Sequence, residues 1–231
     1  MLSYLRLIAL LFLVSSLFSI FSCQNASPPQ SVNNLYADYF IRYLASEKQL
    51  RAEATFAEGD SLQNAIPKTF PSVFFQGEAM DQRDLGPQGI RYKAERGNDN
   101  EEEYVFVIKD KSGEEQKFTM ELPKIEDFKV GEAASISKGF PISWTGQPLS
   151  NDEELVIMLT DKDSKANVVQ IKGPSTSNQV DISPRKLSNM VAGKYSVYLV
   201  RKQTGRKDNP QNYATYSTEY YTPSLSFQLM K

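Results

Sequence analysis

Apolar and polar residues alternate along much of the chain after residue 32, and this pattern predicts β-strands. The clearest case is 50–56, where four apolar residues are separated by Arg51, Glu53 and Thr55. A period of two gives a half-buried strand with one apolar and one polar face. The preceding stretch, 34–45, is rich in Tyr and Phe, and we predict that it pairs with 50–56 as a hairpin. Its aromatic residues also fall at helical spacing, so a helix over 34–45 stays an alternative.

Shorter alternating stretches predict four further strands in this half of the chain. They lie around 73–76, 90–95, 104–109 and 117–121. The last two flank Asp110–Gly113, a sequence suited to a hairpin turn because glycine accepts a positive φ. We therefore predict a β-rich N-terminal domain over 33–122. The mixed, less periodic stretch 123–133 is predicted to be a linker.

The C-terminal part, 134–231, shows the same strand signals at regular intervals. Phe140, Ile142 and Trp144 alternate with polar or small residues, and 155–159 is a continuous apolar run of strand length. Short strands separated by turn residues are typical of β-sandwiches. Further strands are predicted at 168–171, 180–182 and 193–199. The fold class predicted for the whole chain is all-β, with two β-sandwich-like domains in tandem.

Two stretches of the C-terminal part carry a family resemblance. Ile142–Trp144 resembles the early, Trp-bearing strand of fibronectin type III-like domains, and Gly193–Val197 resembles the penultimate strand of Ig-like and fibronectin-like sandwiches. The resemblance implies a sandwich over 134–231. It also implies core packing for Trp144 and, for Tyr195, a hydroxyl that bonds back across the corner before its strand.

The first residues follow a different pattern. A start with one positive charge, Arg6, is followed by the apolar run Leu7–Ile20 and then by the small residue Ser22. These three parts describe a secretory signal peptide over 1–22. The run is shorter than the roughly 20 apolar residues that a membrane span needs, and serines interrupt it. Two alternatives stay open. One is an uncleaved anchor helix, and the other is an ordinary signal peptide that happens to end near a cysteine.

Ile20–Cys23 resembles the lipobox of bacterial lipoproteins, and Phe21 within it resembles variants found in the Bacteroidetes. The resemblance implies cleavage before Cys23 and a diacylglycerol on its thiol, with two or three acyl chains such as palmitate on the cysteine as a whole. More than one acyl chain gives stable attachment to a bilayer. Residues 23–32 would then be the lipidated cysteine and a tether. We expect an outer-membrane protein of the cell envelope that faces the periplasm, with the cell surface as the alternative.

The composition removes several classes of chemistry. The chain contains no histidine and a single cysteine, Cys23. Histidine-dependent hydrolases, zinc sites with histidine ligands and thiol catalysis are therefore excluded. We predict no catalytic residue, no cofactor and no metal site. The alternative is a carboxylate-dependent enzyme that acts on envelope polysaccharide.

Charge is distributed unevenly, with an excess of Lys and Arg after residue 183 although the formal net charge of the chain is −2. Arg201, Lys202, Arg206 and Lys207 are predicted to lie on a long loop after the strand of Tyr195. Such a cluster is a candidate contact for an anionic partner, such as lipid headgroups or an acidic protein. An ordinary solvated hairpin tip is the competing interpretation. Nucleic acid is not expected as a partner of an exported acidic protein.

Three further motifs are weaker candidates for a functional site. The acidic run 97–103 is interpreted as a solvated loop, and Asp161–Ser164 as a strand-ending turn and not a calcium loop. Asp60–Leu62 resembles the short O-glycosylation motif of Bacteroidetes envelope proteins, which makes Ser61 a candidate glycosylation site.

A tyrosine-rich segment near the C-terminus is relevant to binding. Tyr213, Tyr216, Tyr220 and Tyr221 are aromatic residues that a glycan-binding module would need, and edge-strand packing is the simpler explanation. If the segment is a regular strand, Tyr216 and Tyr220 share one face and Tyr221 takes the other. The function predicted from the sequence is that of a membrane-anchored lipoprotein acting as a binding or structural module for an envelope protein or glycan.

Overall fold

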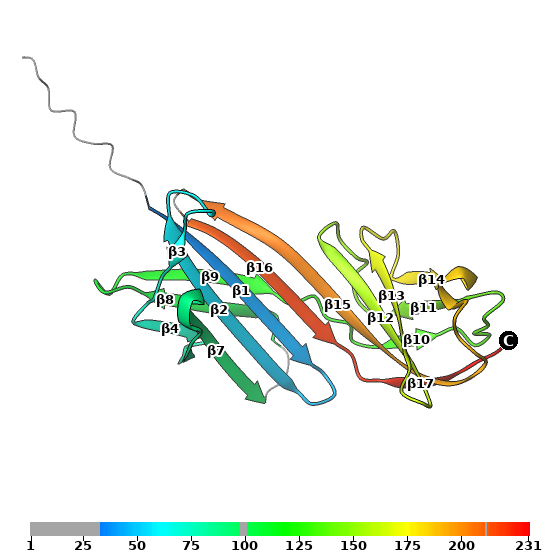
Figure 1. Ribbon diagram of the computed structural model, residues 1–231. Helices are drawn as coiled ribbons and strands as arrows, with labels where there is room; N and C mark the ends of the chain where they lie inside the picture. Colours follow the sequence, from blue (N-terminus) through cyan, green and yellow to red (C-terminus); the bar gives the residue numbers. More distant parts are fainter. Residues whose placement is uncertain (1–32, 98–100, 211) are drawn as a thin grey trace, which may run out of the picture. The chain divides into compact units, whose positions relative to one another are not determined.

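The computed structural model describes residues 33–97, 101–210 and 212–231, and Asn33–Lys231 forms one compact unit. These residues form β-strands joined by turns, loops and short 3-10 helices (Figure 1). The all-β, sandwich-like class is thereby confirmed. The predicted signal peptide, Cys23 and the tether lie outside the described residues. Within the described ranges, no helix has the length and apolar character needed to cross a bilayer.

The elements before residue 122 agree with the strands predicted there and add short ones. They are β1 (Asn34–Leu44), β2 (Gln49–Gly59), β3 (Ile66–Pro67), β4 (Ser72–Phe75), β5 (Glu78–Ala79), β6 (Asp81–Asp84), η2 (Gly86–Gln88), β7 (Ile90–Gly97), β8 (Glu103–Lys109) and β9 (Glu115–Glu121).

The remaining elements include every strand predicted after residue 134. They are β10 (Phe128–Val130), β11 (Phe140–Trp144), β12 (Glu153–Asp161), β13 (Ala166–Lys172), β14 (Gln179–Ile182), η3 (Pro184–Leu187), β15 (Gly193–Asn209), β16 (Asn212–Tyr221) and β17 (Leu225–Leu229).

The first two strands form the predicted hairpin, and the alternative helix over 34–45 is wrong. Tyr39 and Ile41 of β1 lie opposite Ala54 and Ala52 of β2, and all four side chains are buried. The apparent helical spacing arises because β1 carries aromatic residues on both faces, with Phe40 pointing away from the buried set. Burial on one face fixes the register of the pair.

One large sheet extends across the whole compact unit, in the order β13-β12-β15-β16-β1-β2-β7-β6. The strand that joins its two ends is β15, which pairs with β12 and β17 over its first part and with β16 over its second. β16 then runs parallel to β1, from Leu35 opposite Asn212 to Leu44 opposite Tyr221. Figure 1 shows the orange strand β15 beside the red strand β16, which in turn lies beside the blue strand β1.

Each end of this sheet is covered by a smaller sheet. In the first half, β5-β4-β8-β9 packs through Tyr39 of β1, whose ring lies 4.8 Å from that of Phe106 and 4.2 Å from that of Phe118. In the second half, β10-β11-β14 packs through Phe140, whose ring lies 5.4 Å from that of Phe227. Two sandwiches therefore share one sheet. The division into tandem domains at 123–133 stays a prediction, with that sheet continuous on both sides of it.

Two segments differ from their predicted structure. The stretch predicted as a linker contains β10, and its Ile125 and Phe128 are 1% and 4% exposed. A single strand of three residues is too short to show a clear alternation, so the pattern concealed it. The loop predicted after residue 199 is wrong, because β15 continues to Asn209.

Trp144 and Tyr195 have the structural roles that the resemblance implies. Trp144 is 3% exposed and its indole Nε1 donates a hydrogen bond to the carbonyl of Gln147 at 3.0 Å. Tyr195 is 4% exposed, and its hydroxyl donates to the carbonyl of Val191 at 3.1 Å, across the corner before β15. Both polar ends are satisfied, so each ring packs in the core without an unpaired group.

Candidate functional site

The four basic residues predicted to meet an anionic partner do not form a cluster. They lie on β15, where successive side chains point to opposite faces of the sheet. Arg201 and Lys207 are on the inner face, and Lys202 and Arg206 are on the outer face. Each of them also has a partner within the chain. Lys202 binds Glu219 at 3.0 Å, Arg206 binds Asp208 at 2.7 Å, and Lys207 donates to the carbonyl of Thr119 at 2.7 Å.

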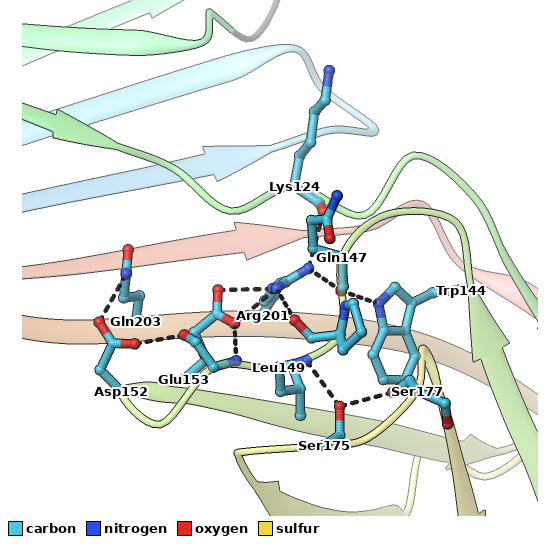
Figure 2. Close-up of polar contacts among 12 residues, drawn as sticks. Lys124, Trp144, Gln147, Leu149, Asp152, Glu153, Ser175, Ser177, Arg201 and Gln203 are labelled. Atoms are coloured by element: carbon cyan, nitrogen blue, oxygen red, sulfur yellow. Dashed lines mark hydrogen bonds and ion pairs between the residues drawn. The ribbon is translucent and has the colours of Figure 1, made fainter.

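Arg201 is buried against Glu153 (Figure 2). Its Nη2 lies 2.7 Å from Oε2 of Glu153 and its Nε lies 3.0 Å from Oε1, with only 3% and 4% of the two side chains exposed. Two parallel bonds of this kind are the strong, directional form of an arginine–carboxylate pair. Oε2 also accepts a hydrogen bond from the backbone N–H of Ser150 at 2.7 Å. Neither member of the pair is available to an outside anion or cation.

Backbone carbonyls accept hydrogen bonds from the remaining N–H groups of the Arg201 guanidinium. Nη1 donates to Gln147 at 3.0 Å and to Lys124 at 3.5 Å, and Nη2 donates to Pro148 at 3.0 Å. With the two bonds to Glu153, these contacts use all five N–H donors of arginine. Figure 2 shows how they hold the loop between β11 and β12 against the segment after β9. Arg201 is therefore a structural residue at the point where β15 leaves one sandwich for the other.

A cavity of about 690 Å³ opens beside this pair, and much of its lining is acidic. Glu101, Glu103, Glu121 and Glu126 border it, so the end of the acidic run 97–103 does contribute to a concave surface. Glu153 at its edge is already paired with Arg201. Within the described residues, no group of three or more His, Cys, Asp or Glu side chains is placed to hold a metal ion.

The second acidic motif is a turn, as interpreted from the sequence. Asp161 ends β12, and its Oδ1 accepts hydrogen bonds from the backbone N–H groups of Asp163 at 2.9 Å and Lys165 at 2.8 Å. Ser164 takes a φ of 64° within the turn. A carboxylate that accepts bonds from the residues just after it closes a tight turn without any ion.

A groove of about 510 Å³ lies on the outer face of the large sheet, where β1 begins. One wall is aromatic, because the rings of Tyr36 on β1 and Tyr213 on β16 stack at 5.3 Å and 14°. The guanidinium of Arg206 on β15 lies 5.2 Å from the ring centre of Tyr213. Three neighbouring strands thus supply a row of stacked groups. A cation on an aromatic face and an offset ring pair are both attractive arrangements.

Polar side chains surround the aromatic wall of the groove. Asp38 accepts a hydrogen bond from the hydroxyl of Thr215 at 2.7 Å. Asp60 lies in the turn after β2, where its Oδ1 accepts from Ser61 at 3.2 Å and from Asn64 at 3.3 Å. Ser61, the candidate glycosylation residue, therefore lines the groove. Its glycosylation stays a prediction.

The tyrosines of β16 divide as the strand pattern predicts. Tyr216 and Tyr220 are on the inner face, where Tyr216 packs at 6.1 Å from Phe118 and Tyr220 at 5.7 Å from Tyr43. Burial raises the pKa of both hydroxyls above the usual value for tyrosine. Tyr221 is on the outer face, 5.4 Å from the guanidinium of Arg42. Of the four, Tyr213 is the one that lines the groove.

Tyr36 lines the groove but was not among the functional candidates predicted from the sequence. Its importance depends on Tyr213, which stands directly opposite it in the parallel pair of β1 and β16. The two residues are far apart in the chain, and no local pattern links them. The sequence does contain one indication of this site. The alternation of β1 places Tyr36 and Asp38 on the same polar face.

Comparisons with known proteins give no family for the chain. No protein-family model matches it. No curated protein matches it either. Among solved structures it is similar to a tetra-tandem repeat in the extending region of a large adhesion protein, with 11% identity and a TM-score of 0.28 over 84% of this chain and 50% of that one.

A second similar structure is Tp47, the 47-kilodalton lipoprotein of Treponema pallidum, with 8% identity and a TM-score of 0.32. The match covers 88% of this chain and 52% of Tp47. The chain therefore spans about half the length of each of these two structures. Likeness at this level does not bear on function, which has to be argued from the site itself.

Proposed function

We propose that this chain is a lipid-anchored protein of a bacterial cell envelope that acts as a binding module for an envelope protein or glycan. Ile20–Cys23 supports the anchoring, because it resembles a lipobox and contains the sole cysteine. A cysteine with two or three acyl chains holds a protein stably at a bilayer without a spanning helix. The proposed location is the outer membrane, facing the periplasm.

The observation that carries the binding role is the groove around Tyr36. It is concave, it combines an aromatic wall with carboxylate and hydroxyl groups, and its volume of about 510 Å³ is that of an ordinary ligand site. It also lies at the start of β1. Asn34 borders the groove and follows Cys23 by eleven residues, so the groove is within about 40 Å of the anchor along the chain.

The basic residues of β15 contribute less to binding than their sequence suggests. Arg201 is buried, and Lys207 lies over the rings of Phe118 at 5.3 Å and Tyr216 at 5.7 Å. Lys202 and Arg206 are partly exposed but bound to acidic neighbours. An anionic partner would have to displace those pairs, so we place the binding surface at the groove.

The test of this function is capture from intact envelopes. The full chain is cross-linked in its own cells, purified in detergent, and compared with a chain that carries Tyr36→Ala. Enrichment of a defined envelope protein or glycan by the native chain, reduced in the variant, supports the binding role. Equal recovery from both chains would contradict the placement of the binding surface.

The same preparation tests the enzymatic alternative. Its candidate carboxylates are those around the acidic cavity, such as Glu101 and Glu121. The full chain is incubated with envelope polysaccharide, and released fragments are measured. Turnover that disappears on replacing one of these glutamates by Gln would show that the chain is an enzyme and would overturn the proposal.

A further inference from the structure

We propose that the groove is a saccharide site, in which an uncharged sugar ring lies against Tyr36 and over Ala57. This inference rests on the proposed binding function and names the ligand class of the same groove. It follows from how the strands place large, small and polar side chains around one hollow, and each part of that arrangement is visible in the pairing of β1, β2 and β3.

The hollow exists because Ala57, a small residue of β2, faces Tyr36, a large residue of β1. Tyr36 lies opposite Ala57, and the next outer pair along the strands is Asp38 opposite Thr55. On the other side of β2, Pro67 of β3 pairs with Ala57. Ala57 is therefore the floor of a trough whose walls are Tyr36 and Pro67, and all three residues line the groove.

Tyr36 is the ring that presents a face to this trough. Its neighbour on β16 is Tyr213, which stacks on one side of it, while its neighbour on β2 is Ala57, which is too small to cover the other side. Tyr213 is enclosed between Tyr36 and Arg206. Aromatic faces attract the C–H groups of a sugar ring through the ring quadrupole and exclude water from its apolar side.

Hydrogen-bond acceptors stand at both ends of the trough. Asp38 and Thr55 are at one end, and Asp60 with Asn34 is at the other, where Asn34 Nδ2 donates to the carbonyl of Asp60 at 3.1 Å. An ionised carboxylate has about four acceptor positions. Among the residues that the structure describes, the contacts of Asp38 with Thr215 and of Asp60 with Ser61 and Asn64 leave acceptor positions open for hydroxyl donors.

The charge around the trough selects against acidic sugars. Asp38 and Asp60 each bring a negative charge, and the positive charge of Arg206 is matched by Asp208 at 2.7 Å. A uronic acid or a phosphate group would meet net negative charge here. The site is therefore expected to favour neutral hexoses and N-acetylhexosamines.

The test uses the purified full chain in detergent and two sets of probes. Neutral oligomers of glucose, mannose, galactose and N-acetylglucosamine form the first set, and oligogalacturonate forms the second. Binding is followed by isothermal titration calorimetry. We expect at least one neutral oligomer to bind, with an affinity about tenfold lower for Tyr36→Ala and nearly unchanged for Tyr36→Phe.

Tyr221→Ala is the matched control, because Tyr221 is an outer-face tyrosine of the same sheet that lies outside the groove lining. Its affinity should equal that of the native chain, and unchanged unfolding midpoints show that both alanine variants fold. Ser61→Ala is measured as well, because it removes the candidate glycosylation residue. In this variant no sugar attached to Ser61 can occupy the groove in place of the probe.

Three results would overturn the inference. They are no binding of any neutral oligomer, equal loss of affinity in Tyr36→Ala and Tyr221→Ala, and tighter binding of oligogalacturonate than of neutral oligomers. If none of the oligomers binds while a defined protein is captured from envelopes through the groove, the saccharide inference fails and the proposed binding function stands. Failure of both experiments would remove the binding function itself.

Discussion

Arg201 of β15 and Glu153 of β12 form a buried, doubly hydrogen-bonded ion pair at the place where the two sandwiches share a strand. The pair lies opposite the loop between β11 and β12, whose carbonyls at Gln147 and Pro148 also accept from Arg201. Arg201 thus holds the loop between β11 and β12 in place. It also connects this loop with the carbonyl of Lys124, in the segment that follows the first sandwich.

Arg201→Met is expected to destabilise the protein by about 3–5 kcal/mol, because it leaves the Glu153 carboxylate buried without its partner. The free energy of unfolding in urea measures this loss. Lys93→Met is the control, since Lys93 and Glu95 form an ion pair with 31% and 44% of their side chains exposed and such pairs contribute at most about 1 kcal/mol. Equal losses in the two variants would show that the Arg201 pair is not structural.

A second prediction concerns Gly205 of β15, which lies opposite Tyr216 of β16. The ring of Tyr216 lies over the glycine, so an added Cβ would overlap the ring and its hydroxyl. Gly205→Ala should therefore cost about 1–3 kcal/mol of stability through overpacking. Gly193→Ala is the matched control on the same strand, because nothing lies within 4 Å of a Cβ there. A destabilisation no greater than that of the control would contradict this packing.

The environment of Glu219 leads to a prediction of how the free energy of unfolding depends on pH. Burial acts to raise the pKa of this carboxyl, but hydrogen bonds from Lys202 and Arg42, together with their charges, outweigh burial and lower the pKa below the ordinary value for glutamate. A carboxyl with a lowered folded-state pKa stabilises the fold above its unfolded pKa, and this contribution is lost as the pH falls through the folded-state pKa.

Glu219→Gln should accordingly show lower stability at pH 7 and a shallower decline on acidification below about pH 5. Urea unfolding at a series of pH values from 7 to 3 measures both effects. Glu102→Gln, which removes an exposed carboxylate, controls for the change in net charge. The assignment would be refuted by an acid decline in Glu219→Gln as steep as that of the native chain.

Local patterns predicted the longer strands because their burial follows the sequence. The alternation at Leu50–Phe56 corresponds to the single buried face of β2, and the continuous apolar run Leu155–Leu159 corresponds to a part of β12 that is largely buried on both faces. The pairing of β1 with β16 was not predictable, since Arg42 and Glu219, which meet across it, are 177 residues apart. Nothing in either segment alone specifies a parallel partner so distant in sequence.

The candidate site was less predictable than the fold, for the same reason. Arg201 was expected on a loop because charged residues usually mark a solvated segment, whereas burial with Glu153 allows the strand to continue. The groove requires Tyr36, Tyr213 and Ala57 to meet from three strands. Of these three residues, only Tyr213 is a candidate from the sequence, as part of a tyrosine-rich segment.

The most direct test of a lipid-anchored binding module is fatty-acid labelling of the full chain in its own cells, with and without Cys23→Ala. The native chain is expected to incorporate the labelled fatty acid and to sediment with membranes. The variant should lose the label and enter the soluble fraction, because the acyl chains would provide its attachment to the bilayer. A Cys23→Ala chain that still takes up the label and remains bound to membranes would contradict the lipoprotein assignment.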